Sequence, residues 1–145
     1  MTRQRVEKVL EMKTFNKDLL EMALMRAIRE LDEQTAKLRF LEQSLARTTA
    51  EFERRCRDGR TDFLALDLFH EYILQMTRRI DAQHEAVADK NVIVEDIKGC
   101  FLEAHKEKRL VEILHERLAD IEQKHCAKED QKEMDSHYNS RGLRR

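Results

Sequence analysis

Apolar residues recur every three or four positions through the first half of the chain. Alternate steps of three and four from Val6 to Phe52 pass fourteen positions, of which ten are apolar. The polar exceptions are Lys13, Lys17, Gln34 and Thr48. Such a sustained heptad repeat is typical of a coiled-coil helix. The pattern predicts a helix from about residue 3 to Arg57, roughly 80 Å long at about 1.5 Å per residue.

The sequence CRDGRTD, at residues 56–62, interrupts this repeat. Asp58 and Gly59 suit the end of a helix, so we expect a turn at about residues 58–61. Thr61 is the expected N-cap of the next helix, and Asp62 adds negative charge to its first turn.

A second long helix is expected at about residues 62–138. Its apolar stripe shifts by one residue near Val111, and such shifts locally change coiled-coil winding. The stripe consists of Ile80, Val87, Val94, Ile97, Phe101, Ala104, Val111, Leu114, Leu118 and Ile121. The pattern also allows a break near residue 78, which would make residues 62–78 a separate short helix.

The two helices are expected to pack as an antiparallel hairpin. A turn centred near residue 60 places Ile80 near Phe40 and Phe101 near Leu19, and positions beyond about 115 then have no partner. Apolar residues become sparse there, and residues 127–145 form a polar C-terminal tail. This tail is either solvated and partly disordered or a recognition segment that orders on a partner. The predicted fold is all-α: one elongated antiparallel two-helix coiled-coil hairpin with a long C-terminal helical overhang.

A second apolar face is expected on the first helix, opposite the heptad stripe. It consists of Met12, Phe15, Leu19 and Met22. A two-helix hairpin covers one face of each helix only. Residues 62–78 therefore fold against this second face, or the face meets another protein or a second copy of the chain, or it stays exposed.

The composition agrees with long helices that have little core. Charged residues make up 39% of the chain, with 28 Lys and Arg against 29 Asp and Glu, and aromatic residues make up 6%. This balance gives no bulk attraction to nucleic acid or anionic lipid. No signal peptide or membrane-spanning stretch is recognisable, so a soluble cytoplasmic protein is expected. Cys56, Cys100 and Cys126 lack paired spacing and are expected to be free thiols.

Catalytic and metal-binding motifs give weak signals. The sequence has no Gly-rich phosphate loop and no HExxH or GxSxG motif. Two Glu-x-x-His motifs, Glu112 with His115 and Glu122 with His125, fit the type used by di-iron bundles. Both motifs lie on the same predicted helix, whereas those bundles place them on separate helices. We therefore expect no enzyme activity, no cofactor, no metal and no nucleic-acid binding.

Three stretches identify a related family. They are YILQMTRRIDAQ at 72–83, FLEAHKEKRLVEILHERL at 101–118 and KEDQKEMDSHYNSR at 128–141, and the N-terminal VEKVLEMK also suits the family's start. With these landmarks the chain resembles, nearly end to end, the FliJ family of the flagellar type III export apparatus. The DQKEMD run is the most specific, because no heptad requires it.

The resemblance implies a non-enzymatic central stalk in flagellar biogenesis and chemotaxis. Such a protein promotes assembly of the export ATPase hexamer, couples it to the cytoplasmic domain of the membrane export gate, and escorts export chaperones. It would be a monomer in isolation, peripheral at the cytoplasmic face of the inner membrane, without membrane insertion.

The resemblance also implies interaction residues. The gate-contacting face would fall on Tyr72, Met76, Arg79 and Gln83. The ATPase-facing surface would fall on Lys37, Leu41, Ser44 and Thr48. The C-terminal recognition segment would include Asp130, Gln131, Lys132, Met134 and Asp135.

Two other functions stay open from the sequence. One is the equivalent stalk protein of a virulence type III secretion system. The other is a structural coiled-coil scaffold or regulator that dimerises through the face of Met12, Phe15, Leu19 and Met22.

Overall fold

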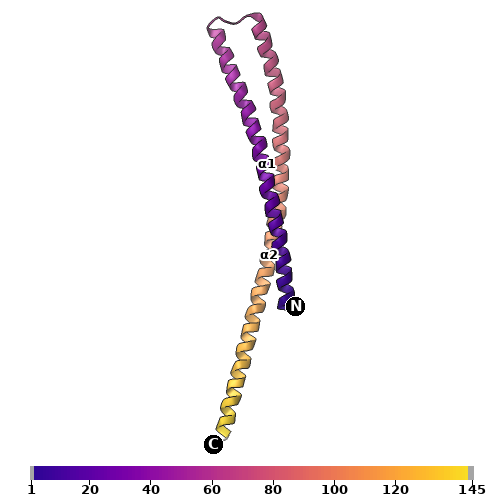
Figure 1. The fold of residues 1–145 in the computed structure, drawn as a ribbon, viewed down its shortest axis with the longest axis vertical. Helices are drawn as coiled ribbons and strands as arrows, with labels where there is room; N and C mark the ends of the chain where they lie inside the picture. The colour runs from indigo at the N-terminus through magenta and orange to yellow at the C-terminus, as the bar shows by residue number, and fades with distance from the viewer. Residues whose placement is uncertain (1, 144–145) are drawn as a thin grey trace. The chain divides into compact units, whose positions relative to one another are not determined.

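The computed structural model describes residues 2–143, and all of its regular structure is helical. Helix α1 spans Arg3–Arg57 and helix α2 spans Phe63–Leu143, joined by a short turn (Figure 1). The structure confirms the predicted all-α helical hairpin. Two compact units make up the chain: a hairpin unit, Glu21–Cys100, and a terminal unit, Met1–Leu20 with Phe101–Arg145. Each unit contains a segment of both helices.

The turn contains a glycine in the left-handed conformation. Gly59 has a φ of 69°. The Gly59 amide donates to the carbonyl of Cys56 at 3.2 Å, and the Arg60 amide donates to the carbonyl of Arg55 at 3.1 Å. These two bonds form a Schellman motif, which satisfies carbonyls at the end of α1. A residue with a Cβ is disfavoured at such a φ, so glycine is what lets α1 end sharply here.

The N-cap of α2 is Asp62, and the prediction of Thr61 is wrong. The Ala65 amide donates to Asp62 Oδ1 at 2.7 Å, and the Leu66 amide donates to the Asp62 carbonyl at 3.2 Å. Because Phe63 is the first residue of α2, the residue before it is the one whose side chain reaches the free amides of the first turn. The Thr61 hydroxyl is buried and has no hydrogen-bond partner.

Cross-helix contacts in the hairpin unit define an antiparallel register centred on the turn. Thr48 and Tyr72, which are hydrogen-bonded, each lie 12 residues from Arg60. Glu30 and Lys90, which form an ion pair at 3.2 Å, each lie 30 residues from it. This is the register that a turn near residue 60 requires.

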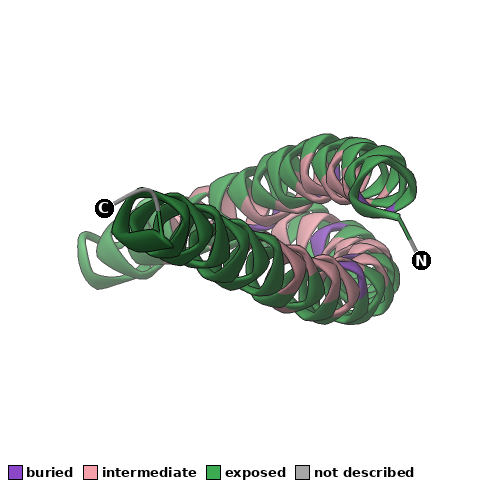
Figure 2. Cartoon of the chain, turned by 90° about the horizontal axis from the view of Figure 1, so that it is seen from below, coloured by how far each residue is buried: buried purple, intermediate pink, exposed green. Residues whose placement is uncertain are grey.

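The buried residues form a thin line between the helices. Figure 2 shows short buried and half-buried stretches alternating with exposed ones along the ribbons. The buried residues of the hairpin unit are Ala27, Leu38, Met76 and Val94, and those of the terminal unit are Val6 and Ala104. A fully buried side chain of this kind contributes about 1.5–3 kcal/mol, so each one matters in so thin a core.

The terminal unit pairs the start of α1 with residues near 105–122 of α2. Lys13 Nζ lies 2.8 Å from Glu107 Oε2, and Arg3 lies 3.2 Å from Glu122 Oε2. Beyond Glu122, residues 123–143 of α2 are all exposed, although they stay helical. Most of the predicted polar tail is therefore part of α2, while its last residues, 144–145, lie outside the described residues. Helix α2 has no break near residue 78.

The second apolar face of α1 is uncovered. Met12, Phe15, Leu19 and Met22 are 70%, 66%, 49% and 63% exposed. Residues 63–78 form the start of α2 and are not a separate short helix. Cys56, Cys100 and Cys126 are exposed free thiols. Within residues 2–143, neither helix contains a stretch apolar enough to cross a membrane.

Replacing Gly59 by Ala should destabilise the turn. An added Cβ at Gly59 meets no atom within 4 Å, so the cost comes from the backbone conformation alone. We expect a loss of about 1–2 kcal/mol in the free energy of unfolding, measured by urea denaturation.

The matched control is Gly99→Ala within α2, where the added Cβ also meets open space. This change should stabilise the protein by about 1 kcal/mol, because alanine has the higher helix propensity. Equal effects of the two substitutions would contradict the role given to the left-handed conformation.

Candidate functional site

The residues expected to contact the export gate lie mostly between the helices. Met76 is 5% exposed, and Tyr72 and Gln83 are half-buried. Arg79 is exposed. Three of these four side chains therefore contribute to holding α2 against α1, and Arg79 is the member that is free to meet a partner.

The Tyr72 hydroxyl links this group to the surface expected to face the ATPase. Thr48 Oγ1 donates to Tyr72 Oη at 3.3 Å, and Tyr72 Oη donates to the Ser44 carbonyl at 3.5 Å. Ser44, Thr48 and Leu41 are half-buried, and Lys37 is exposed. The two groups of predicted binding residues thus meet across the helix interface of the hairpin unit.

A polar pair lies further along the same interface. Gln83 Nε2 donates to the carbonyl oxygen of Gln34 at 2.8 Å and to its side-chain Oε1 at 2.9 Å. Gln34 is one of the polar exceptions in the heptad stripe of α1. A single polar layer of this kind lowers stability but favours one register over others, because any slip leaves the amides unpaired.

The predicted C-terminal recognition segment is a fully exposed part of α2. Asp130, Gln131, Lys132, Met134 and Asp135 all face solvent. Gln131 Nε2 donates to Asp135 Oδ1 at 3.2 Å, a contact within the helix. A shallow hollow of about 360 Å³ is bordered by Met134, His137, Tyr138 and Arg141.

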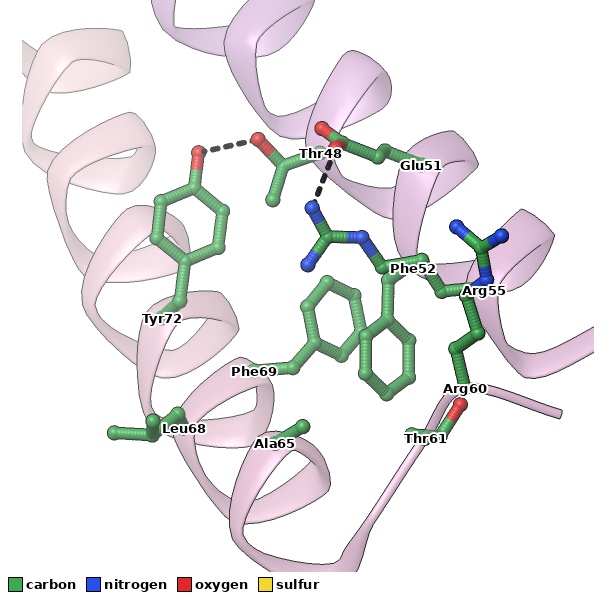
Figure 3. A pocket seen from close by; sticks show the side chains of 10 residues that line it. All are labelled: Thr48, Glu51, Phe52, Arg55, Arg60, Thr61, Ala65, Leu68, Phe69 and Tyr72. Atoms are coloured by element: carbon green, nitrogen blue, oxygen red, sulfur yellow. Dashed lines mark hydrogen bonds and ion pairs between the residues drawn. The ribbon is translucent and has the colours of Figure 1, made fainter. Parts of the chain in front are cut away.

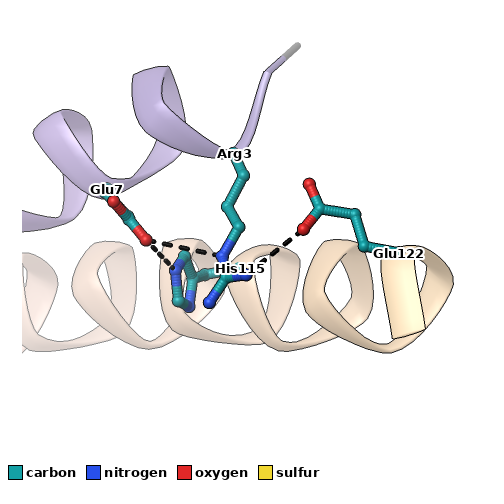
Figure 4. A network of polar contacts seen from close by, with 4 residues as sticks. All are labelled: Arg3, Glu7, His115 and Glu122. Atoms are coloured by element: carbon teal, nitrogen blue, oxygen red, sulfur yellow. Dashed lines mark hydrogen bonds and ion pairs between the residues drawn. The ribbon is translucent and has the colours of Figure 1, made fainter. Parts of the chain in front are cut away.

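An ion-pair network joins the N-terminus of α1 to α2 (Figure 4). Glu7 Oε1 lies 3.4 Å from Arg3 Nε and 3.2 Å from His115 Nε2. Arg3 also reaches Glu122. This network fixes the start of α1 within the terminal unit.

The residues of the two Glu-x-x-His motifs contact other side chains, not one another. His115 and Glu122 contact α1, His125 lies 3.7 Å from Glu129, and Glu112 lies between Lys108 and Arg109. The hydrogen bond from Arg109 lowers the pKa of Glu112, helped by Lys108 and opposed by desolvation. Across the described residues, no three His, Cys, Asp or Glu side chains are grouped so as to hold a metal ion.

A hollow at the turn was not indicated by the heptad pattern (Figure 3). The rings of Phe52 and Phe69 stack with centroids 3.9 Å apart and an angle of 7° between their planes. Beside them, a hollow of about 320 Å³ is bordered by Arg55, Arg60 and Leu68, among others. The sequence signal was the run FLALDLF at 63–69, in which Asp67 is the one polar residue, so that apolar side chains fall on more than one side of a helix.

The fold and these surfaces define an all-helical hairpin whose exposed groups are suited to contacts with other proteins. The family model described as "Flagellar FliJ protein" matches residues 2–145. The chain therefore belongs to the FliJ family, whose members are non-enzymatic components of flagellar type III export. No curated protein and no solved structure matches the chain.

Replacing Met76 and Arg79 by Ala should change the free energy of unfolding by different amounts. Met76→Ala removes a buried side chain from the helix interface and should cost about 2–4 kcal/mol of unfolding free energy. Arg79→Ala, on the exposed side of the same helix, should change it by about 0.5 kcal/mol or less. Urea denaturation followed by circular dichroism measures both, and similar costs would contradict the placement of Met76.

Proposed function

We propose that this chain is the central stalk of a flagellar export apparatus. In this role it promotes assembly of the export ATPase hexamer, couples the ATPase to the export gate, and escorts export chaperones. The observation that carries the proposal is the match to the FliJ family over residues 2–145, on a chain that folds as a helical hairpin. The function needs no bound cofactor, since it depends on contacts alone.

The gate contact is proposed to use two exposed parts of α2. One is Arg79, and the other is the segment that contains Asp130, Lys132 and Met134. Tyr72, Met76 and Gln83 take part indirectly, because their contacts with α1 hold the helix that presents Arg79. A substitution at any of these three would therefore alter binding through the packing of the hairpin unit.

The ATPase contact is proposed to lie on α1, at Lys37 and its neighbours Leu41, Ser44 and Thr48. The exposed ammonium of Lys37 supports a direct contact, whereas the half-buried members support a surface shared by α1 and α2. We place the protein in the cytoplasm, peripheral at the inner membrane beneath the flagellar base. We also propose that it is a monomer before it meets the ATPase.

Charge reversal at Arg79 should weaken binding to the cytoplasmic domain of the export gate. We expect Arg79→Glu to lower the affinity about tenfold, which corresponds to about 1.4 kcal/mol, because a contact with a complementary charge becomes repulsive. Titration calorimetry with the purified gate domain measures this. The control is Arg78→Glu, an equal charge change at an adjacent exposed residue, which should have little effect.

Removal of residues 126–145 should weaken the same binding. The described part of this segment, residues 126–143, is exposed, so the helical content of residues 1–120 should be retained. Unchanged gate affinity in both Arg79→Glu and the truncated chain would refute the proposed gate surface.

A further inference from the structure

The first turns of α2 carry apolar residues on several sides, interrupted by Asp67, and α1 covers one side of them. Ala65 and Phe69 are half-buried. The other apolar residues of this stretch, Phe63, Leu64, Leu66 and Leu68, are 84%, 66%, 50% and 63% exposed. The exposed apolar residues at the turn of the hairpin unit are therefore neighbours that form one surface, in contrast to leucines exposed singly.

Two hollows lie beside the stacked rings within this surface. The hollow of about 320 Å³ described above has Phe52 and Phe69 as its apolar floor and Leu68 at its edge (Figure 3). A second hollow, of about 430 Å³, is bordered by the same two rings together with Phe63, Leu66 and Ile73. Each volume is sufficient for a large apolar side chain from another molecule.

Two arginines, Arg55 and Arg60, border the first hollow. Arg55 is neutralised by Glu51, whose Oε1 lies 2.9 Å from it. Arg60 stands at the edge of the hollow, and the structure gives its guanidinium no ion pair among residues 2–143. Asp62, the nearest acidic residue after it in sequence, is engaged by the Ala65 amide at the start of α2. The hollow therefore combines an apolar floor with an available cation.

We propose that this hollow docks a segment of another protein in which a large apolar side chain stands next to a carboxylate. The apolar side chain packs on the Phe52–Phe69 stack and Leu68, and the carboxylate pairs with Arg60. A protein segment fits better than a small molecule, because the exposed Phe63 and Leu64 extend the apolar surface beyond the hollow. The inference rests on the turn region alone and not on the proposed stalk function.

The test is a selection from a random twelve-residue peptide library displayed on phage. The full chain serves as the target, and the double variant Leu68→Ser, Arg60→Glu is used for counter-selection. We expect enriched peptides to carry an aromatic or large aliphatic residue adjacent to Asp or Glu. Fluorescence anisotropy with one such labelled peptide should show that Leu68→Ser and Arg60→Glu each raise the Kd at least tenfold.

The control is Leu110→Ser, which changes a leucine of similar exposure, 68%, in the terminal unit. It should leave the peptide Kd unchanged, and circular dichroism should show equal helical content in all variants. The proposal would be overturned if no enriched peptide depends on Leu68 and Arg60 for binding, or if the enriched peptides lack acidic residues. Two other results would also overturn it. If sedimentation equilibrium shows a dimer that is lost in Leu68→Ser, the occupant is a second copy of the chain. If the chain binds phosphatidylglycerol vesicles and Leu68→Ser abolishes this binding, the occupant is a membrane.

Discussion

The structure depends on the narrow packing of α1 against α2, in which only a few side chains are fully buried. The few buried residues along it, such as Leu38, Met76 and Val94, provide the main apolar stabilisation of the hairpin unit. A chain with so thin a core cannot compensate easily for a lost side chain. The rest of each helix surface is left to solvent and to partners.

The polar residues within this interface explain why the helices adopt one register. Gln34 with Gln83, and Thr48 with Tyr72, place hydrogen-bonding groups opposite one another at fixed points. A shift of α2 along α1 would separate these partners and bury polar groups without hydrogen bonds, at about 1–3 kcal/mol for each group. The apolar stripe alone would tolerate a shift of seven residues, because its repeat has that period.

This arrangement also connects packing to partner binding. The residues expected to contact the gate and the ATPase are joined through the Tyr72 hydroxyl, which bonds to both Thr48 and Ser44. A partner that displaces the gate-contacting residues would therefore disturb the contacts of the ATPase-facing residues, and the reverse also holds. In the stalk role proposed here, this shared interface would let the state of one partner affect the surface offered to the second.

The fold was predictable from the sequence because it follows from apolar residues that recur at regular spacing. Ten apolar residues at heptad spacing, one Asp-Gly turn and an even charge balance predict two long antiparallel helices, and the structure has them. The register followed from the position of Gly59, whose left-handed φ ends α1. The N-cap was predicted one residue too early, since Thr61 and Asp62 are both good caps and the exact first helical residue decides between them.

The site was less predictable, because a stripe with spacing of three and four fits an exposed binding face and a helix interface equally well. Met76 and Gln83 have that spacing and lie between the helices, whereas Arg79 lies outside. The apolar surface near Phe63 and Leu68 was not evident either. A heptad pattern shows which residues face the partner helix, but it does not show where that helix leaves neighbouring apolar residues uncovered.

The most direct test of the stalk function uses the cognate export ATPase. Its hydrolysis rate and its hexamer fraction would be measured with and without this protein at near-equal concentration, by phosphate release and analytical ultracentrifugation. The account predicts faster hydrolysis together with more hexamer when the protein is present. No change in either quantity, with no complex detected, would contradict the stalk function.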